Sequence, residues 1–108
     1  MASFEDFQKL DIRVAKIMDA EPMEGAKKLY RLKIRIGTEE RALVAGIAEN
    51  YAPDELLGKK ILVVTNLEPK TIKGIESKGM LLAAVSDDQK KIVLCTVDED
   101  VADGTRVM

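Results

Sequence analysis

The 108-residue chain contains no histidine and a single cysteine, Cys95. A disulfide within the chain is therefore impossible, and a zinc site of the usual ligand types is excluded. The lack of histidine also excludes a histidine base and a cysteine–histidine pair for nucleophilic catalysis. Cys95 follows the apolar run Ile92 to Leu94, so we interpret it as a buried strand residue rather than a reactive thiol.

Aromatic residues are scarce: the chain has two phenylalanines, two tyrosines and no tryptophan. Phe4 and Phe7 lie three positions apart in a predicted short helix over residues 3–8, so we expect both to pack on the rest of the protein. Tyr30 falls on the core face of a predicted strand. Barrels that bind single-stranded nucleic acid generally stack bases on exposed aromatic rings. This mode of binding is therefore poorly supported.

Long apolar runs are absent as well, and none approaches the roughly 20 residues that a membrane helix needs. The first six residues include acids and no apolar core, so we do not expect a signal peptide. The length suits one domain, which we predict to span residues 1–108. We expect a cytoplasmic protein without membrane contact.

Recognisable catalytic motifs are also missing. The chain has neither a phosphate-cradling P-loop nor a dinucleotide fingerprint. Its acids cluster mainly at 5–6, 87–88 and 98–100, where turns and chain ends are expected. We therefore expect a non-catalytic protein with no metal and no cofactor.

The charge is distributed unevenly along the chain. The net charge of −2 argues, by itself, against a nucleic-acid partner. However, segments 26–41 and 59–80 carry +4 and +3, and the three segments around them carry −3 each. If the fold brings the two basic segments together, one face is positive although the molecule is not.

Short segments of strand periodicity follow one another. In the clearest, residues 29–36, an apolar face beginning at Tyr30 alternates with a face of three cations, which we interpret as a solvated outer face. The first strand changes phase after Ala15, which predicts a bulge or bend. The predicted strands are 11–19, 29–36, 41–45, 61–65, 80–86 and 91–96, with a loop at 20–26 and a short helix between Pro53 and Gly58. This order predicts an all-β protein: an OB-fold five-stranded barrel with a short helix between strands 3 and 4 and short terminal additions.

The stretch from Asn66 to Ala84 is the best candidate for a functional segment. It begins after the apolar run 61–65, and Pro69 ends that strand because proline cannot donate to a ladder. Three lysines, two small hydroxyl residues and a glycine then precede another apolar run at 80–84. A basic loop rich in donors is thus held between two core strands, an arrangement in which binding residues are often found.

Several motifs, in order along the chain, resemble the tRNA-binding domain family, which includes the C-terminal domain of methionyl-tRNA synthetase and free-standing relatives. The motifs are KLDIRV at 9–14, KKLY at 27–30, AGIA at 45–48, YAPDEL at 51–56, VTNL with PK at 64–70, KGIESKGM at 73–80, LAA at 82–84 and GTRV at 104–107. One position departs from the pattern: many relatives have a serine where this chain has Ala45. That change removes a hydrogen-bond donor beside the expected groove.

The resemblance implies a set of tRNA-binding residues at the matching positions. They are Lys28, Asn66, Lys70, Lys73, Ser77, Lys78 and Met80. The lysines are expected to meet phosphates, Asn66 and Ser77 to hydrogen-bond sugar, phosphate or an end base, and Met80 to contact ribose or base. Asn66, Ser77 and Met80 each also have a purely structural interpretation: Asn66 as a strand cap, Ser77 as a brace of the loop and Met80 as a core residue.

The resemblance also implies a function. We expect non-catalytic, structure-dependent and largely sequence-nonspecific tRNA binding by a homodimer. Such a domain or subunit would raise the tRNA affinity of methionyl-tRNA synthetase, in cis or in trans. The alternative is a homodimeric chaperone of exported proteins on the same fold. A large exposed apolar patch would favour the chaperone, whereas the lysines at 70, 73 and 78 favour RNA.

Overall fold

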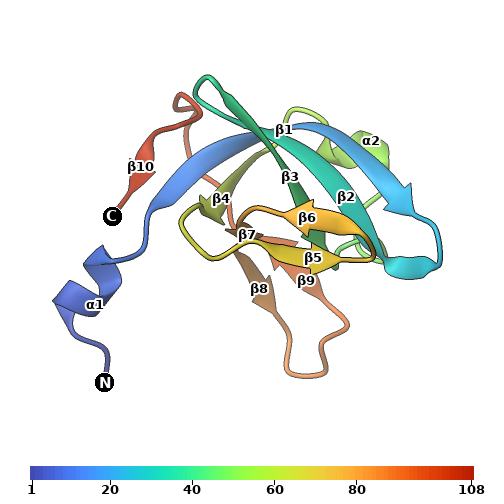
Figure 1. Ribbon diagram of the computed structural model, residues 1–108, viewed down its shortest axis with the longest axis horizontal. Coiled ribbons are helices and arrows are strands. Elements are labelled where there is room, and N and C mark those ends of the chain that lie inside the picture. The colour runs from blue at the N-terminus through green and yellow to red at the C-terminus, as the bar shows by residue number, and fades with distance from the viewer.

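Two long curved strands, β1 (Ile12–Met23) and β2 (Ala26–Ile36), form the hairpin on which the other elements assemble (Figure 1). The computed structural model describes residues 1–108. The remaining elements are α1 (Phe4–Gln8), β3 (Glu39–Ala45), α2 (Pro53–Leu56), β4 (Lys60–Val64), β5 (Lys70–Ile72), β6 (Ile75–Ser77), β7 (Met80–Leu81), β8 (Ala83–Val85), β9 (Ile92–Leu94) and β10 (Arg106–Val107). The predicted all-β class is confirmed, as is the short helix between the third and fourth strands. None of the helices has the length and hydropathy needed to cross a membrane.

The main sheet is antiparallel, in the order β3-β2-β1-β4-β7, with β10 paired to the start of β1. The pairs β5–β6 and β8–β9 form separate two-stranded hairpins. β3 and β7 are the two ends of the hydrogen-bonded path, and no ladder joins them. The closed five-stranded barrel therefore stays a prediction.

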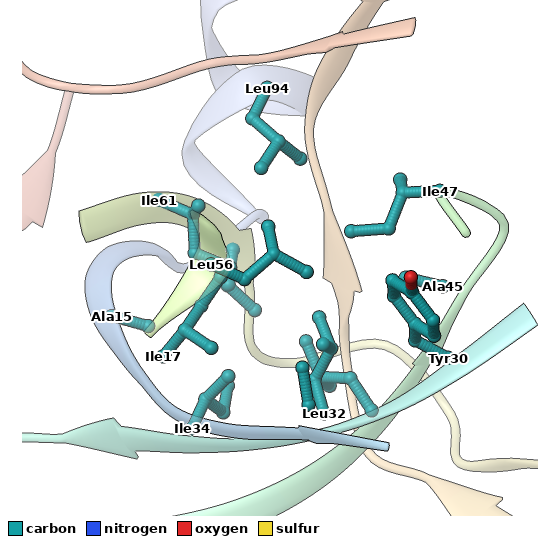
Figure 2. Close-up of a cluster of buried hydrophobic side chains, with 13 residues drawn as sticks. Ala15, Ile17, Tyr30, Leu32, Ile34, Ala45, Ile47, Leu56, Ile61 and Leu94 are labelled. Carbon is teal, nitrogen blue, oxygen red and sulfur yellow. The ribbon is translucent and has the colours of Figure 1, made fainter. Parts of the chain in front are cut away.

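Apolar side chains from six elements and the segment after β3 meet in one core (Figure 2). The alternation of β2 places Leu32 and Ile34 inside, fully buried, and leaves Arg31 and Lys33 exposed, as the sequence pattern predicts. The third cation of that face, Arg35, is half-buried and is bonded to Asp103 rather than solvated. The core consists of Ala15, Ile17, Ala20, Tyr30, Leu32, Ile34, Leu43, Ala45, Ile47, Leu56, Ile61, Val63 and Leu94. The hydroxyl of Tyr30 donates to the carbonyl of Tyr51 at 2.6 Å, so the buried phenol is hydrogen-bonded.

The prediction of a loop at residues 20–26 is wrong. β1 continues through Pro22 to Met23, and a turn at Glu24 and Gly25 leads directly into β2. Beyond Ile17, β1 has β2 as its only ladder partner, so a proline that donates no hydrogen bond is tolerated on the unpaired side. The register of β1 against β2 shifts between Ile17 and Asp19, which confirms the predicted bulge.

The strand predicted at 80–86 is divided into β7 and β8. Leu82, between them, donates to the carbonyl of Leu62 at 2.9 Å and accepts from the amide of Cys95 at 3.0 Å. The chain therefore changes its partner from β4 to β9 at this residue. The strand predicted at 91–96 also ends early, and Cys95, predicted to be a buried strand residue, lies half-buried just beyond β9.

α1 begins as predicted, but its packing was predicted wrongly. The hydroxyl of Ser3 accepts from the amide of Asp6 at 3.1 Å, and the Asp6 carboxylate accepts from the amide of Ser3 at 3.2 Å, which is a capping box. Phe4 is 73% exposed and Phe7 is 42% exposed. The connection to β1 leaves the helix beyond the end of the sheet, where no other element covers it (Figure 1).

The C-terminal segment is fastened to the β2–β3 turn through Asp103. Its carboxylate accepts from the Arg35 guanidinium at 3.1 and 3.2 Å and from the amide of Gly37 at 3.0 Å. The hydrogen bonds from Arg35 lower the pKa of the Asp103 carboxyl below its ordinary value. The amide of Gly104 donates to the carbonyl of Val14 at 2.7 Å, which brings β10 alongside β1.

Candidate functional site

The basic loop predicted from the sequence is a two-stranded hairpin, β5–β6, with Lys73 and Gly74 as its two turn residues. Both have positive φ, 52° for Lys73 and 80° for Gly74. Positive φ at both central residues is the geometry of a type I′ turn, which matches the twist of the flanking strands. The turn forms the tip of the β5–β6 ribbon (Figure 1), and Lys73, which is exposed, is one of its two residues.

The two faces of the β5–β6 hairpin differ. The cross-strand pair Ile72 and Ile75 is half-buried, and Ser77 is buried, so this face is directed at the protein. The cross-strand pair Thr71 and Glu76 is exposed on the opposite face. The ribbon is thus amphipathic, and its exposed face is polar.

Ser77 joins the hairpin to β3. Its hydroxyl accepts from the amide of Val44 at 3.0 Å and donates to the carbonyl of Gly79 at 3.4 Å. The amide of Lys78 donates to the carbonyl of Ala42 at 3.0 Å, so β6 lies along the edge of β3. With only 5% of its surface exposed, Ser77 acts as the brace considered from the sequence.

The three lysines of the hairpin are exposed. Lys78 lies 4.0 Å from the carboxylate of Glu76, a weak contact between half-exposed groups. Lys70 and Lys73 have no carboxylate within 4.0 Å. Their ammonium groups are therefore available to an anionic ligand.

Asn66 uses its side chain within the protein. Its carbonyl oxygen accepts from the amide of Asp11 at 2.8 Å, and its amide nitrogen donates to the carbonyl of Lys9 at 2.6 Å. The residue thus fixes the segment between α1 and β1 against the end of β4. Its second amide hydrogen remains available for a ligand.

Met80 follows a tightly packed position. A Cβ atom at Gly79 would lie 3.0 Å from the carbonyl oxygen of Val64 and 3.2 Å from side-chain carbons of Leu43 and Val63, so only glycine fits there. Met80 itself is 52% exposed. The core interpretation of Met80 is therefore wrong, and its thioether is accessible at the root of the hairpin.

Lys28 belongs to a different hollow. It lines a space of about 730 Å³ together with Asn50, Val85 and the β8–β9 turn, where Asp88 and Lys90 lie. No hairpin residue lines this hollow. The structure therefore brings six of the seven predicted site residues to the β5–β6 hairpin and its two ends, and places Lys28 apart from them.

A groove between the hairpin and the outer face of β2 and β3 was not predicted from the sequence. It consists of two adjoining hollows of about 440 and 380 Å³. Both are lined by Arg31, Glu40, Arg41 and Ala42; the first also by Asp19, Glu21, Leu32 and Lys33, and the second by Gly74, Ile75, Glu76 and Lys78. We call this space the hairpin groove. The alternation of β2 predicted the outward cations, but not that a hairpin some 40 positions later would lie over them.

The hairpin groove is also where the two basic segments meet. Arg31, Lys33 and Arg41 come from the first segment, and Lys78 comes from the second. Carboxylates of Asp19, Glu21, Glu40 and Glu76 are interspersed among them. Lys70 and Lys73 lie outside this mixture of charges, and neither has a carboxylate within 4.0 Å.

Comparison with known sequences gives related proteins over nearly the whole chain. A family model described as "Putative tRNA binding domain" matches residues 12–106. The chain is 50% identical over 105 residues to methionine–tRNA ligase of Thermotoga maritima and 51% identical over 105 residues to that of Archaeoglobus fulgidus. These alignments cover 97% of this chain but 16% of each ligase, so the chain spans a small part of the curated relatives that it matches.

Solved structures match the fold over its full length. The MetRS related protein from Pyrococcus horikoshii has a TM-score of 0.93 and 41% identity, covering 100% of this chain and 98% of that one. The chaperone CsaA from Bacillus anthracis has a TM-score of 0.91 and 31% identity, covering 100% of this chain and 99% of that one. A protein described as related to MetRS and a protein described as a chaperone thus share this fold.

Proposed function

Because the chain belongs to the tRNA-binding domain family, we propose that it binds tRNA through the β5–β6 hairpin. The observation that carries the proposal is the pair of exposed lysines, Lys70 and Lys73, that have no carboxylate within 4.0 Å. Ammonium groups of this kind bind phosphates and release counterions from the nucleic acid. Lys78 and Met80 extend the same surface, with a third cation and an apolar contact for ribose or base.

The binding is expected to depend on tRNA shape more than on sequence. The hairpin offers lysines, backbone amides and few hydrogen-bonding side chains that could read base edges. Such groups respond to the positions of phosphates and 2′-hydroxyls along a folded backbone. The acids elsewhere on the molecule disfavour indiscriminate binding along any phosphate chain.

We further propose that residues 1–108 act as a single auxiliary domain for methionyl-tRNA synthetase in the cytoplasm. The two curated ligases support this partner, since the chain matches 16% of their length at about half identity. A binding domain linked to, or associated with, a catalytic body raises the local concentration of tRNA there. No catalytic role is assigned to the chain.

A homodimer is part of the same proposal. Phe4 and Phe7 are exposed on α1, and Met108 is 91% exposed at the other end of the chain. Both ends therefore offer apolar surface that a second copy would cover. Analytical ultracentrifugation measures the oligomeric state directly, and a monomer at tens of micromolar would contradict this part of the proposal.

The test of tRNA binding uses Lys73. Lys73→Glu reverses the charge at the tip, while Lys73→Asn removes the charge and places in the turn a residue that tolerates positive φ. We expect the asparagine variant to bind folded tRNA about fivefold to tenfold more weakly and the glutamate variant more weakly still. Lys59→Asn is the matched control, because Lys59 is also exposed but lies outside the hairpin.

Affinities for folded tRNA and for an unstructured RNA of equal length, at two salt concentrations, complete this test. Tighter and salt-sensitive binding to folded tRNA supports recognition of shape through phosphates. Equal binding to both RNAs would indicate a general single-strand binder. If both Lys73 variants bind as the wild type and Lys59→Asn do, the hairpin is not the tRNA site.

A chaperone function is the second candidate. The similarity to the chaperone CsaA of Bacillus anthracis supports it, as does the exposed apolar side of α1. The unpaired lysines of the hairpin have no role in binding an apolar peptide, which is why we prefer RNA. Failure to bind either RNA, together with saturable binding of an apolar peptide, would reverse this preference.

A further inference from the structure

Arg31 is the one arginine whose guanidinium has no partner within the protein. The chain has five arginines, and the other four contact carboxylates; they are Arg13, Arg35, Arg41 and Arg106. Arg31 is exposed on the outer face of β2 and makes no hydrogen bond and no ion pair within 4.0 Å. Its donors are therefore satisfied by solvent alone.

The position of Arg31 is central to the hairpin groove. Arg31 lines both hollows, whose floor is formed by residues of β2 and β3, and residues of β6 line the opposite side of the second hollow. Gly74 and Ile75, next to the proposed phosphate contact at Lys73, line the same hollow as Arg31. A backbone that contacts the tip of the hairpin and continues along it would therefore pass Arg31.

The other cations of the groove already have partners. Lys33 lies 3.6 Å from the carboxylate of Glu40, and Lys78 lies 4.0 Å from that of Glu76. Arg41 donates to the Glu39 carboxylate at 2.9 and 3.2 Å and to the carbonyl of Thr65 at 2.6 Å. Arg31 alone can offer a full guanidinium face without breaking an existing contact.

Glu21 is the internal competitor of Arg31. The two residues are directly opposite in the β1–β2 ladder and line the same hollow. Directly opposite side chains of an antiparallel pair start about 4.5–5.5 Å apart at Cβ, so the Glu21 carboxylate can reach the guanidinium. In this structure, however, the carboxylate oxygens of Glu21 lie more than 4.0 Å from the guanidinium nitrogens of Arg31.

We propose that the hairpin groove receives a phosphodiester segment of the bound RNA and that Arg31 is its bidentate phosphate contact. The planar fork of a guanidinium matches two oxygens of one phosphate, which a lysine ammonium does not. Glu21 weakens this contact by attracting the same guanidinium. The inference rests on the proposed tRNA-binding function and adds a contact on the sheet to those on the hairpin.

The experiment measures dissociation constants for folded tRNA at two salt concentrations for the wild type, Arg31→Ala, Arg31→Lys and Glu21→Gln. We expect Arg31→Ala to weaken binding about tenfold and to reduce the salt dependence by about one ion. Arg31→Lys should recover part of this loss, because it keeps the charge without the fork. Glu21→Gln should tighten binding about twofold to threefold. Lys59→Ala is the control for loss of an exposed cation.

Two results would overturn the inference. Equal affinities of Arg31→Ala and Lys59→Ala contradict it, because Arg31 would then contribute no more to binding than any other solvated surface cation. Weaker binding by Glu21→Gln also contradicts it, because the carboxylate would then contact the RNA. Lys73→Asn distinguishes failure of the proposed tRNA-binding function from failure of the Arg31 contact. If Lys73→Asn weakens binding while Arg31→Ala does not, the proposed function stands and the contact in the hairpin groove is wrong. If neither variant changes binding, both fail.

Discussion

The hydroxyl of Ser77 illustrates, at the scale of one residue, the difference between a motif position and a ligand contact. The resemblance assigned Ser77 to tRNA, but its hydroxyl accepts from the amide of Val44 and is buried. Loss of the hydroxyl would leave that amide without a partner, and an unsatisfied buried donor is costly. The residue is therefore expected to affect binding through the position of the hairpin.

We predict that Ser77→Ala lowers the free energy of unfolding by about 1–3 kcal/mol. Thr71→Ala is the matched control, because Thr71 is an exposed hydroxyl on the other face of the same hairpin, and it should change stability by less than about 0.5 kcal/mol. Urea denaturation measures both. A variant Ser77→Ala with unchanged stability and greatly reduced tRNA affinity would show instead that the hydroxyl contacts RNA.

Single residues also show what could be predicted from the sequence. The exposure of Lys70 and Lys73 was predictable, because a basic segment between two apolar strands must lie at the surface. The role of Asn66 was not, because its partners, Lys9 and Asp11, lie more than 50 positions earlier in the chain. Only the fold brings these groups together.

At the scale of elements, the connection between β6 and β7 depends on Gly79. This residue has a φ of 127°, and a Cβ atom there would lie 3.0 Å from the carbonyl oxygen of Val64. Both the backbone conformation and the lack of space exclude a larger residue. Gly74, by contrast, has a positive φ but open space around it.

We predict that Gly79→Ala destabilises the protein by about 2–4 kcal/mol, whereas Gly74→Ala, which meets only the conformational cost, loses about 1 kcal/mol. Thermal or urea unfolding of the two variants checks the difference. Equal losses would mean that β4 and Leu43 can move away from an added methyl group, and that the packing at Gly79 is looser than the distances indicate.

The elements themselves were only partly predictable. The alternating pattern of β2 and the proline and glycine around α2 are local signals. α2 forms where it was predicted, and β2 covers the predicted residues 29–36 but begins three residues earlier, at Ala26. The division of the strand at 80–86 depends on the exchange of β4 for β9 as partner at Leu82, which no local pattern encodes. The packing of α1 failed for a similar reason, because whether a surface exists under Phe4 and Phe7 is decided by the rest of the fold.

At the scale of the whole molecule, two carboxylates hold distant parts of the chain together. Asp103 accepts from Arg35, and Asp11 accepts from the hydroxyl of Thr65 and from Arg13. The hydrogen bond from Thr65, followed by that from Arg13, lowers the pKa of Asp11, as the hydrogen bonds from Arg35 lower the pKa of Asp103. A carboxyl whose pKa is lower in the folded state stabilises the fold above its ordinary pKa of about 3.9, and the stabilisation is lost as pH falls through the folded value.

We therefore predict that the free energy of unfolding changes little from these groups between about pH 5 and 7 and falls below about pH 4. Asp103→Asn should be less stable at pH 6 and should lose less further stability on going to pH 3, because one of the titrating groups is gone. Urea denaturation at pH 6, 4 and 3 measures both curves. Parallel curves for the variant and the wild type would exclude Asp103 as a source of the acid sensitivity.

The turn at Lys73 and Gly74 also affects how the protein ages chemically. Asparagine followed by glycine fits a type I′ turn best, but in that pair the glycine amide nitrogen attacks the asparagine side chain easily, since glycine has no Cβ to hinder the approach. The attack expels the side-chain nitrogen as ammonia and closes a five-membered succinimide ring, and water then opens this ring to leave a carboxylate. Lysine at position 73 does not undergo this reaction, whereas the Asn–Gly pair of the Lys73→Asn variant does. That variant therefore gains negative charge as it ages, and its tRNA affinity has to be measured on freshly prepared protein.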